Sequence, residues 1–156
     1  MTTQETNTLQ LHKLGIEVDE YLNENFDYNT IIRMLALHNE IGGNIRDYKQ
    51  STYDDNTFIV PCEHGYTNDN NNTTLLAAYQ VLTDDEADEL AREYIEDYLD
   101  DELSNIPSDL RDYFDDDAFV RDVLKIGGRK EYIALYDRQE SYQDIDDVTY
   151  YIYRTN

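Results

Sequence analysis

Residues 83–117 combine a very high density of acid with the periodicity of an amphipathic helix. The segment contains sixteen carboxylates and only two arginines. A stretch this acidic is usually disordered, but here the apolar residues recur at steps of three and four, which predicts a helical stripe that becomes buried. The stripe comprises Ala87, Leu90, Ala91, Tyr94, Ile95, Tyr98, Leu99 and Leu103. We therefore expect the charge to lie on the surface of a folded helix.

The carboxylates of this segment occupy the other faces of the helix and continue beyond it. Neighbours three or four residues apart on a helix have Cβ atoms about 5–6 Å from each other, so they form a regular array of fixed anions. We interpret Tyr94 and Tyr98 as core residues whose hydroxyls reach water. The candidate partner-binding residues are the outward carboxylates Asp85, Asp88, Glu89, Glu93, Glu96, Asp97, Asp100, Asp101, Asp109, Asp112, Asp115, Asp116 and Asp117.

The charge balance of the whole chain restricts its partners. Thirty-five Asp and Glu against twelve Lys and Arg give a net charge of −23 over 156 residues. Such a surface repels DNA, RNA and anionic membranes, so we expect no direct nucleic-acid binding and a basic protein as partner. Adaptation to high salt would spread the acid evenly, whereas here it is concentrated in one segment.

Cysteine content and hydropathy indicate a soluble protein of a reducing compartment. The single Cys62 excludes an internal disulfide. No segment approaches the roughly 20 apolar residues of a membrane span, and no apolar leader follows a basic start. We therefore expect a cytoplasmic location.

The N-terminal half carries moderate secondary-structure signals. Its apolar runs predict a short strand within 9–14, a short helix at 18–23, a helix from Asn29 to Ile41 and a strand at Thr57–Pro61. The Gly42-Gly43 pair ends the longer helix, and the Asn-rich stretch 66–74 predicts an exposed loop. The apolar run 75–82 fits either a buried strand or a helix.

The C-terminal half begins with a sharper signal. Thr83 and Glu86 have the spacing of a capping box, in which each side chain bonds the other residue's backbone N–H. The further predicted elements are a long helix ending near Asn105, a short helix from Ser108 to Phe114, a third helix at 116–125, and two paired antiparallel strands at 131–137 and 148–154.

These elements predict an α+β fold of amphipathic acidic helices with small antiparallel β elements. The chain is long enough for one domain or two small lobes. In the second case, residues 1–82 form an α/β lobe of unassigned role, and residues 83–156 form an acidic helical segment ending in a β-hairpin.

The sequence offers no convincing catalytic or metal centre. Cys62-Glu63-His64 lacks the further ligands of a zinc site and an orienting group for nucleophilic catalysis. The acidic clusters match no calcium loop, because the required Gly and terminal Glu are missing. We therefore expect no enzyme activity, no cofactor and no dedicated metal. A metal-dependent hydrolase would require these carboxylates to converge on one pocket.

The stretch from Glu89 to Val123 resembles the ArdA antirestriction proteins of mobile elements and phages. That family carries an Ala-x-x-Tyr-Ile-Glu helix, then Pro, Leu-x-x-Tyr, and finally Ala and an Arg-Asp pair. The matching positions here are Ala91, Tyr94, Ile95, Glu96, Pro107, Leu110, Tyr113, Ala118, Arg121 and Asp122. The resemblance covers under a quarter of the chain. We interpret Arg121-Asp122 as a surface ion pair and Pro107 as a helix stop.

The resemblance implies an elongated acidic homodimer that mimics bent B-form DNA and blocks Type I restriction–modification enzymes in the bacterial cytoplasm. A bend at Ile106-Pro107 would then let the stripe of carboxylates continue around a curve. Two alternatives stay open from the residues alone. The chain could be an anti-CRISPR protein that occupies the nucleic-acid groove of a CRISPR effector, or an acidic adaptor for a basic protein without DNA mimicry.

Overall fold

The computed structural model describes residues 15–66 and 75–156 of the chain. The first part contains α2 (Ile16–Asn25), α3 (Tyr28–Ile41), a 3-10 turn (Ile45–Asp47), β1 (Lys49–Gln50), β2 (Thr57–Tyr66) and β3 (Leu76–Thr83). The second part contains α4 (Asp84–Glu102), α5 (Ser108–Arg111), α6 (Asp116–Gly127), α7 (Lys130–Ile133), β4 (Ser141–Ile145) and β5 (Val148–Arg154). The predicted α+β class is confirmed.

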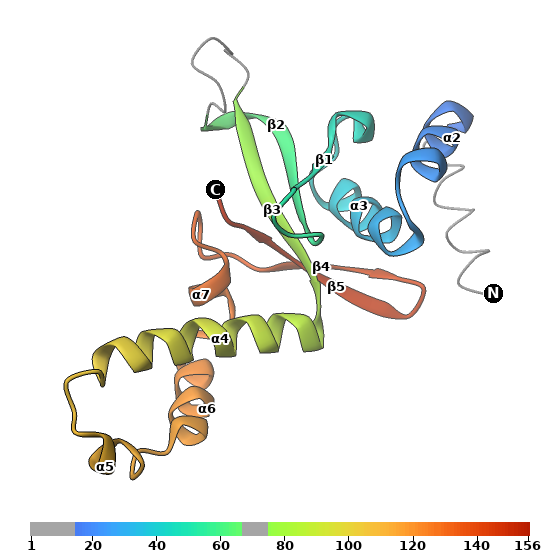
Figure 1. Cartoon of the computed structure of the whole chain (residues 1–156). Coiled ribbons are helices and arrows are strands. Elements are labelled where there is room, and N and C mark those ends of the chain that lie inside the picture. The colour runs from blue at the N-terminus through green and yellow to red at the C-terminus, as the bar shows by residue number, and fades with distance from the viewer. Residues whose placement is uncertain (1–14, 67–74) are drawn as a thin grey trace.

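One antiparallel sheet joins the two halves of the chain. Its strands lie in the order β1-β2-β3-β5-β4, and β3 pairs with β5 in the register Gln80 to Tyr153. The segments 1–82 and 83–156 therefore share a sheet, with their boundary at the junction of β3 and α4 (Figure 1).

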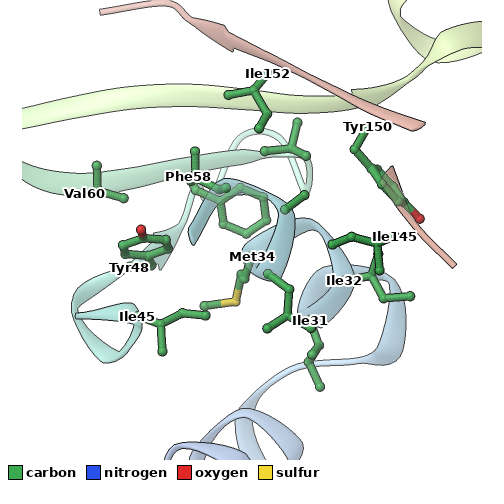
Figure 2. Packing of buried hydrophobic residues seen from close by; sticks show 14 of the residues in the cluster. Ile31, Ile32, Met34, Ile45, Tyr48, Phe58, Val60, Ile145, Tyr150 and Ile152 are labelled. Carbon is green, nitrogen blue, oxygen red and sulfur yellow. The ribbon is translucent and has the colours of Figure 1, made fainter. Parts of the chain in front are cut away.

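Both faces of the sheet are covered by helices. Successive residues of a strand point to opposite sides, so each strand contributes side chains to both faces. On one face Phe58, Val81 and Ile152 belong to a core that is completed by α3 and α2. Figure 2 shows side chains from the sheet meeting Met34 and its neighbours on α3. On the other face Tyr153 packs in a second cluster with α4 and α7. The helix α4 is thus attached to the sheet at its first turns.

The helices of the N-terminal half agree with the sequence except at one cap. The helix predicted at 18–23 is α2, and the ambiguous run 75–82 is the strand β3. Helix α3 begins at Tyr28, and its cap is Asp27, which accepts a hydrogen bond from Thr30 N at 2.8 Å. The expected cap at Asn29 is wrong, because Asp27 is equally suited to this role and lies two residues earlier. The strand predicted within 9–14 and the loop at 67–74 lie outside the described residues.

The predicted strand at 131–137 is wrong. Residues 130–133 form the short helix α7, and the hairpin partner of β5 is β4, from the polar stretch between the two predicted strands. Ile133 and Ala134 are consecutive and both buried, an arrangement that a strand with one buried face does not give. Strand β4 lies at the edge of the sheet and buries only Ile145, so it shows little apolar pattern.

A two-residue turn closes the hairpin of β4 and β5. Ile145 pairs with Val148, and the two residues between them have positive φ, 53° at Asp146 and 65° at Asp147. Positive φ at both central residues is the requirement of a type I′ turn, for which Asn-Gly or Asp-Gly is preferred. Asp147 therefore holds a backbone conformation that is more favourable for glycine.

Replacing Asp147 with glycine should stabilise the protein. Relief of the left-handed backbone is worth about 1 kcal/mol, and we expect the free energy of unfolding, measured by urea denaturation, to rise by about this amount. As a control, Asp122→Gly in the middle of α6 should lower that free energy by about 0.3 kcal/mol. A decrease for Asp147→Gly similar to that of the control would contradict the turn assignment.

Candidate partner-binding surface

The start of α4 is fixed by a capping box. Thr83 N donates to Glu86 Oε1 at 2.8 Å, and Glu86 N donates to Thr83 Oγ1 at 3.4 Å. The sequence prediction of this box is confirmed. Because the box closes directly after β3, the direction of α4 is set by the sheet.

Glu86 also binds Arg33 of α3. The guanidinium donates to both carboxylate oxygens of Glu86, at 2.8 and 3.0 Å, and to the carbonyl oxygen of Val81 at 2.7 Å. Burial raises the pKa of the Glu86 carboxyl, but the hydrogen bonds from Arg33 and from the Thr83 backbone outweigh burial and lower this pKa below its ordinary value. The pair therefore links α3, β3 and α4 through a carboxylate that stays ionised.

Arg129, just before α7, is a second attachment of α4. Its side chain is largely buried, donates to Asp84 Oδ1 at 2.7 Å and to Asp88 Oδ1 at 3.0 Å, and lies 4.4 Å from the ring centroid of Tyr151. Two carboxylates of the first turns of α4 are thus neutralised where the helix meets the rest of the protein.

The buried side of α4 is narrower than the sequence predicts. Ala87, Ala91, Ile95 and Leu99, every fourth residue, are buried. Tyr94 and Tyr98 remain 42% and 56% exposed, so their assignment to the core is wrong. The reason is that α6 and α7 pack against only part of the helix surface, so neither tyrosine ring is enclosed.

We call residues 84–127, which form α4, α5 and α6, the arm. Figure 1 shows α4 running away from the sheet, α5 near its far end, and α6 lying against α4. Helix α4 ends at Glu102, earlier than expected. Ser108 makes no capping hydrogen bond, because Pro107 occupies the cap position of α5. Pro107 therefore stands between two separate helices.

The two arginines of the acidic segment hold the arm together. Arg111 of α5 binds Asp116 of α6 through two hydrogen bonds of 2.8 and 2.9 Å and Asp100 of α4 at 3.1 Å. These bonds lower the pKa of the Asp116 carboxyl. In the same way Arg92 of α4 binds Asp117 at the start of α6 at 2.7 Å.

The candidate carboxylates divide into two groups. Five are paired with arginines within the fold, namely Asp88, Glu96, Asp100, Asp116 and Asp117, and Asp115 caps α6 by accepting from Ala118 N. Seven are exposed and make no ion pair within the described residues: Asp85, Glu89, Glu93, Asp97, Asp101, Asp109 and Asp112. We call these seven the open carboxylates.

Other chemistry has little structural support within residues 15–66 and 75–156. No group of three metal-binding side chains comes together there, and Cys62 is a half-buried residue of β2. None of the described helices is both long and apolar enough to cross a membrane.

The Arg121-Asp122 ion pair is confirmed, with a distance of 3.7 Å between exposed side chains.

The sequence reading missed the arginines that anchor the arm. A signal for Arg33 was present, since it is the only charged residue in the apolar run 31–37, and a charge in such a run needs a buried partner. No comparable signal marks Arg129, which follows two glycines in a polar stretch. Comparisons with known protein families, with curated proteins and with solved structures found no match.

The Arg33–Glu86 pair gives the stability of the protein a defined pH dependence. At neutral pH we expect Glu86→Gln to lower the free energy of unfolding by about 1–2 kcal/mol. This is the contribution of a hydrogen-bonded ion pair, reduced because the pair is partly accessible to solvent. The pKa of Glu86 is depressed in the folded state. Its stabilising contribution is therefore present above the unfolded-state pKa and is lost as pH falls through the folded-state pKa.

Urea unfolding of wild type and variant at a series of acidic pH values measures this difference. We expect the stabilities of wild type and Glu86→Gln to converge as the pH falls. Glu89→Gln, one turn away and without an ion pair, is the matched control, and its difference from the wild type should not change in this way. A gap between wild type and Glu86→Gln that stays constant down to the lowest pH would contradict the assignment.

Proposed function

We propose that this protein is a non-enzymatic anti-defence inhibitor that mimics DNA through the carboxylates of the arm. It occupies the DNA-binding groove of a Type I restriction–modification enzyme in the bacterial cytoplasm. The observation that carries the proposal is the row of five open carboxylates along α4, a helix that is anchored at its base by Arg33 and Arg129. The resemblance to the ArdA proteins covers the same helices, and an ArdA-like homodimer would extend the array.

The spacing of charge suits a groove that binds phosphates. Helix α4 has 19 residues and is therefore about 28 Å long, a distance over which one DNA strand presents about eight phosphates. Six exposed carboxylates of α4 make no ion pair within the described residues, namely Glu102 and five of the open carboxylates. The density of charge is thus comparable to that of one DNA strand.

The anchoring of the arm favours tight binding. A flexible acidic tail would lose conformational entropy on entering a groove, whereas a helix already held in place loses little. Because Arg92 and Arg111 are satisfied inside the arm, they do not compete with the arginines and lysines of a partner. The carboxylates therefore act collectively, and no single residue dominates.

The test is inhibition of a purified Type I restriction–modification enzyme at physiological salt. The variant neutralises five open carboxylates of α4, as Asp85→Asn, Glu89→Gln, Glu93→Gln, Asp97→Asn and Asp101→Asn. We expect the wild type to compete with DNA and the variant to lose at least tenfold in affinity, because five charge contacts that release counterions are removed. Inhibition by the wild type should also weaken as salt is raised.

A second variant with the same change in net charge separates position from total charge. It neutralises exposed carboxylates far from the arm in the sequence: Glu20→Gln, Glu24→Gln, Asp47→Asn, Asp55→Asn and Asp147→Asn. This control should inhibit as well as the wild type. Equal loss in both variants would contradict the assignment to the arm. If the wild type does not inhibit, the Type I target is wrong. The same proteins are then tested for competition with DNA on CRISPR effectors: competition indicates a DNA mimic with a different target, and its absence indicates an adaptor.

A further inference from the structure

The arginines of this protein repeatedly bind to a carboxylate and an aromatic ring together. Within the described residues this holds for Arg33 with Glu86 and Tyr150, for Arg129 with Asp84 and Tyr151, and for Arg111 with Asp116 and Phe114. The guanidinium carbon lies between 4.4 and 5.8 Å from the ring centroid in each. A planar guanidinium can bond a carboxylate with its edge and stack on a ring with its face.

Helix α4 carries the same combination on an exposed flank. Tyr94, Asp97, Tyr98 and Asp101 occupy positions i, i+3, i+4 and i+7 of the helix, so they are neighbours on one side of it. We call these four residues the tyrosine–aspartate face. All four are exposed, and neither aspartate makes an ion pair within the described part of the chain. Within the described residues no arginine stacks on Tyr94 or Tyr98, so this face offers the same chemical groups to an arginine from outside.

We propose that the tyrosine–aspartate face binds arginine side chains of the partner protein and discriminates against lysine. The inference rests on the proposed function and specifies the chemistry of its target. The two tyrosines offer ring faces beside acceptors, which reward a guanidinium more than the compact, strongly hydrated ammonium of lysine. A groove seated on this part of the arm therefore presents arginines to it.

Charge complementarity selects this occupant among the alternatives. A second copy of the chain that met this face through its own arm would oppose two rows of carboxylates, so a homodimer would have to form through another surface. Nucleic acid and anionic membranes are repelled for the same reason. An apolar partner segment would leave Asp97 and Asp101 without counterions in the interface, which is unfavourable. An arginine-presenting protein satisfies the rings and the carboxylates together.

The test uses two capped octapeptides, one of arginine and one of lysine, titrated into the full-length protein by calorimetry at physiological salt. We expect the arginine peptide to bind about tenfold more tightly than the lysine peptide. In the double variant Tyr94→Leu and Tyr98→Leu, which keeps apolar side chains at both positions, this ratio should fall to about two or less. Binding of the lysine peptide should weaken much less than binding of the arginine peptide.

The control is Tyr53→Leu, at a tyrosine that is 98% exposed in the loop before β2, and it should keep the full preference. Equal binding of both peptides to the wild type, or an arginine preference that survives in the double variant, would overturn the inference. No restriction enzyme is present in this assay. An arginine preference without enzyme inhibition would therefore reject the Type I target alone, and inhibition without the preference would reject the tyrosine–aspartate face alone.

Discussion

The bond between Arg33 and Glu86 is the interaction on which the position of the arm depends. Arg33 is 8% exposed and sits in the buried run of α3, so its guanidinium needs acceptors close at hand. It obtains them from Val81 of β3 and from Glu86 at the start of α4. The same carboxylate closes the capping box with Thr83. One ion pair therefore connects the core helix, the central strand and the acidic helix.

The distribution of basic residues explains how so acidic a chain folds. The chain has 35 acidic and 12 basic residues, and several of the basic ones lie at contacts between elements. Arg111 joins α4, α5 and α6, and Arg129 joins the start of α4 to the segment before α7. Carboxylates at these contacts are neutralised, and the outer surface keeps its charge. The repulsion that would separate the helices is thus removed where they meet, and it remains where it faces solvent.

Local signals predicted most of the helices, whereas long-range pairing was not predictable. The capping box at Thr83 and the glycine after α3 act within a few residues, so their effect is visible in the sequence. The hairpin partner of β5 was assigned wrongly because β4 buries a single residue and its polar composition resembles that of a loop. The exposure of Tyr94 and Tyr98 depends on which side of α4 is covered by α6 and α7, and periodicity alone carries no such information.

The open carboxylates act in opposite directions on folding and on binding. Their mutual repulsion destabilises the folded arm, and salt screens that repulsion, so stability should rise with ionic strength. Attraction to a basic groove is screened by the same ions, so affinity should fall. The ion pairs of Arg33 and Arg129 are short and their guanidinium groups are largely buried, so salt screens them less than it screens the open carboxylates. Opposite salt dependences of stability and affinity therefore distinguish charges that serve recognition from charges that serve the fold.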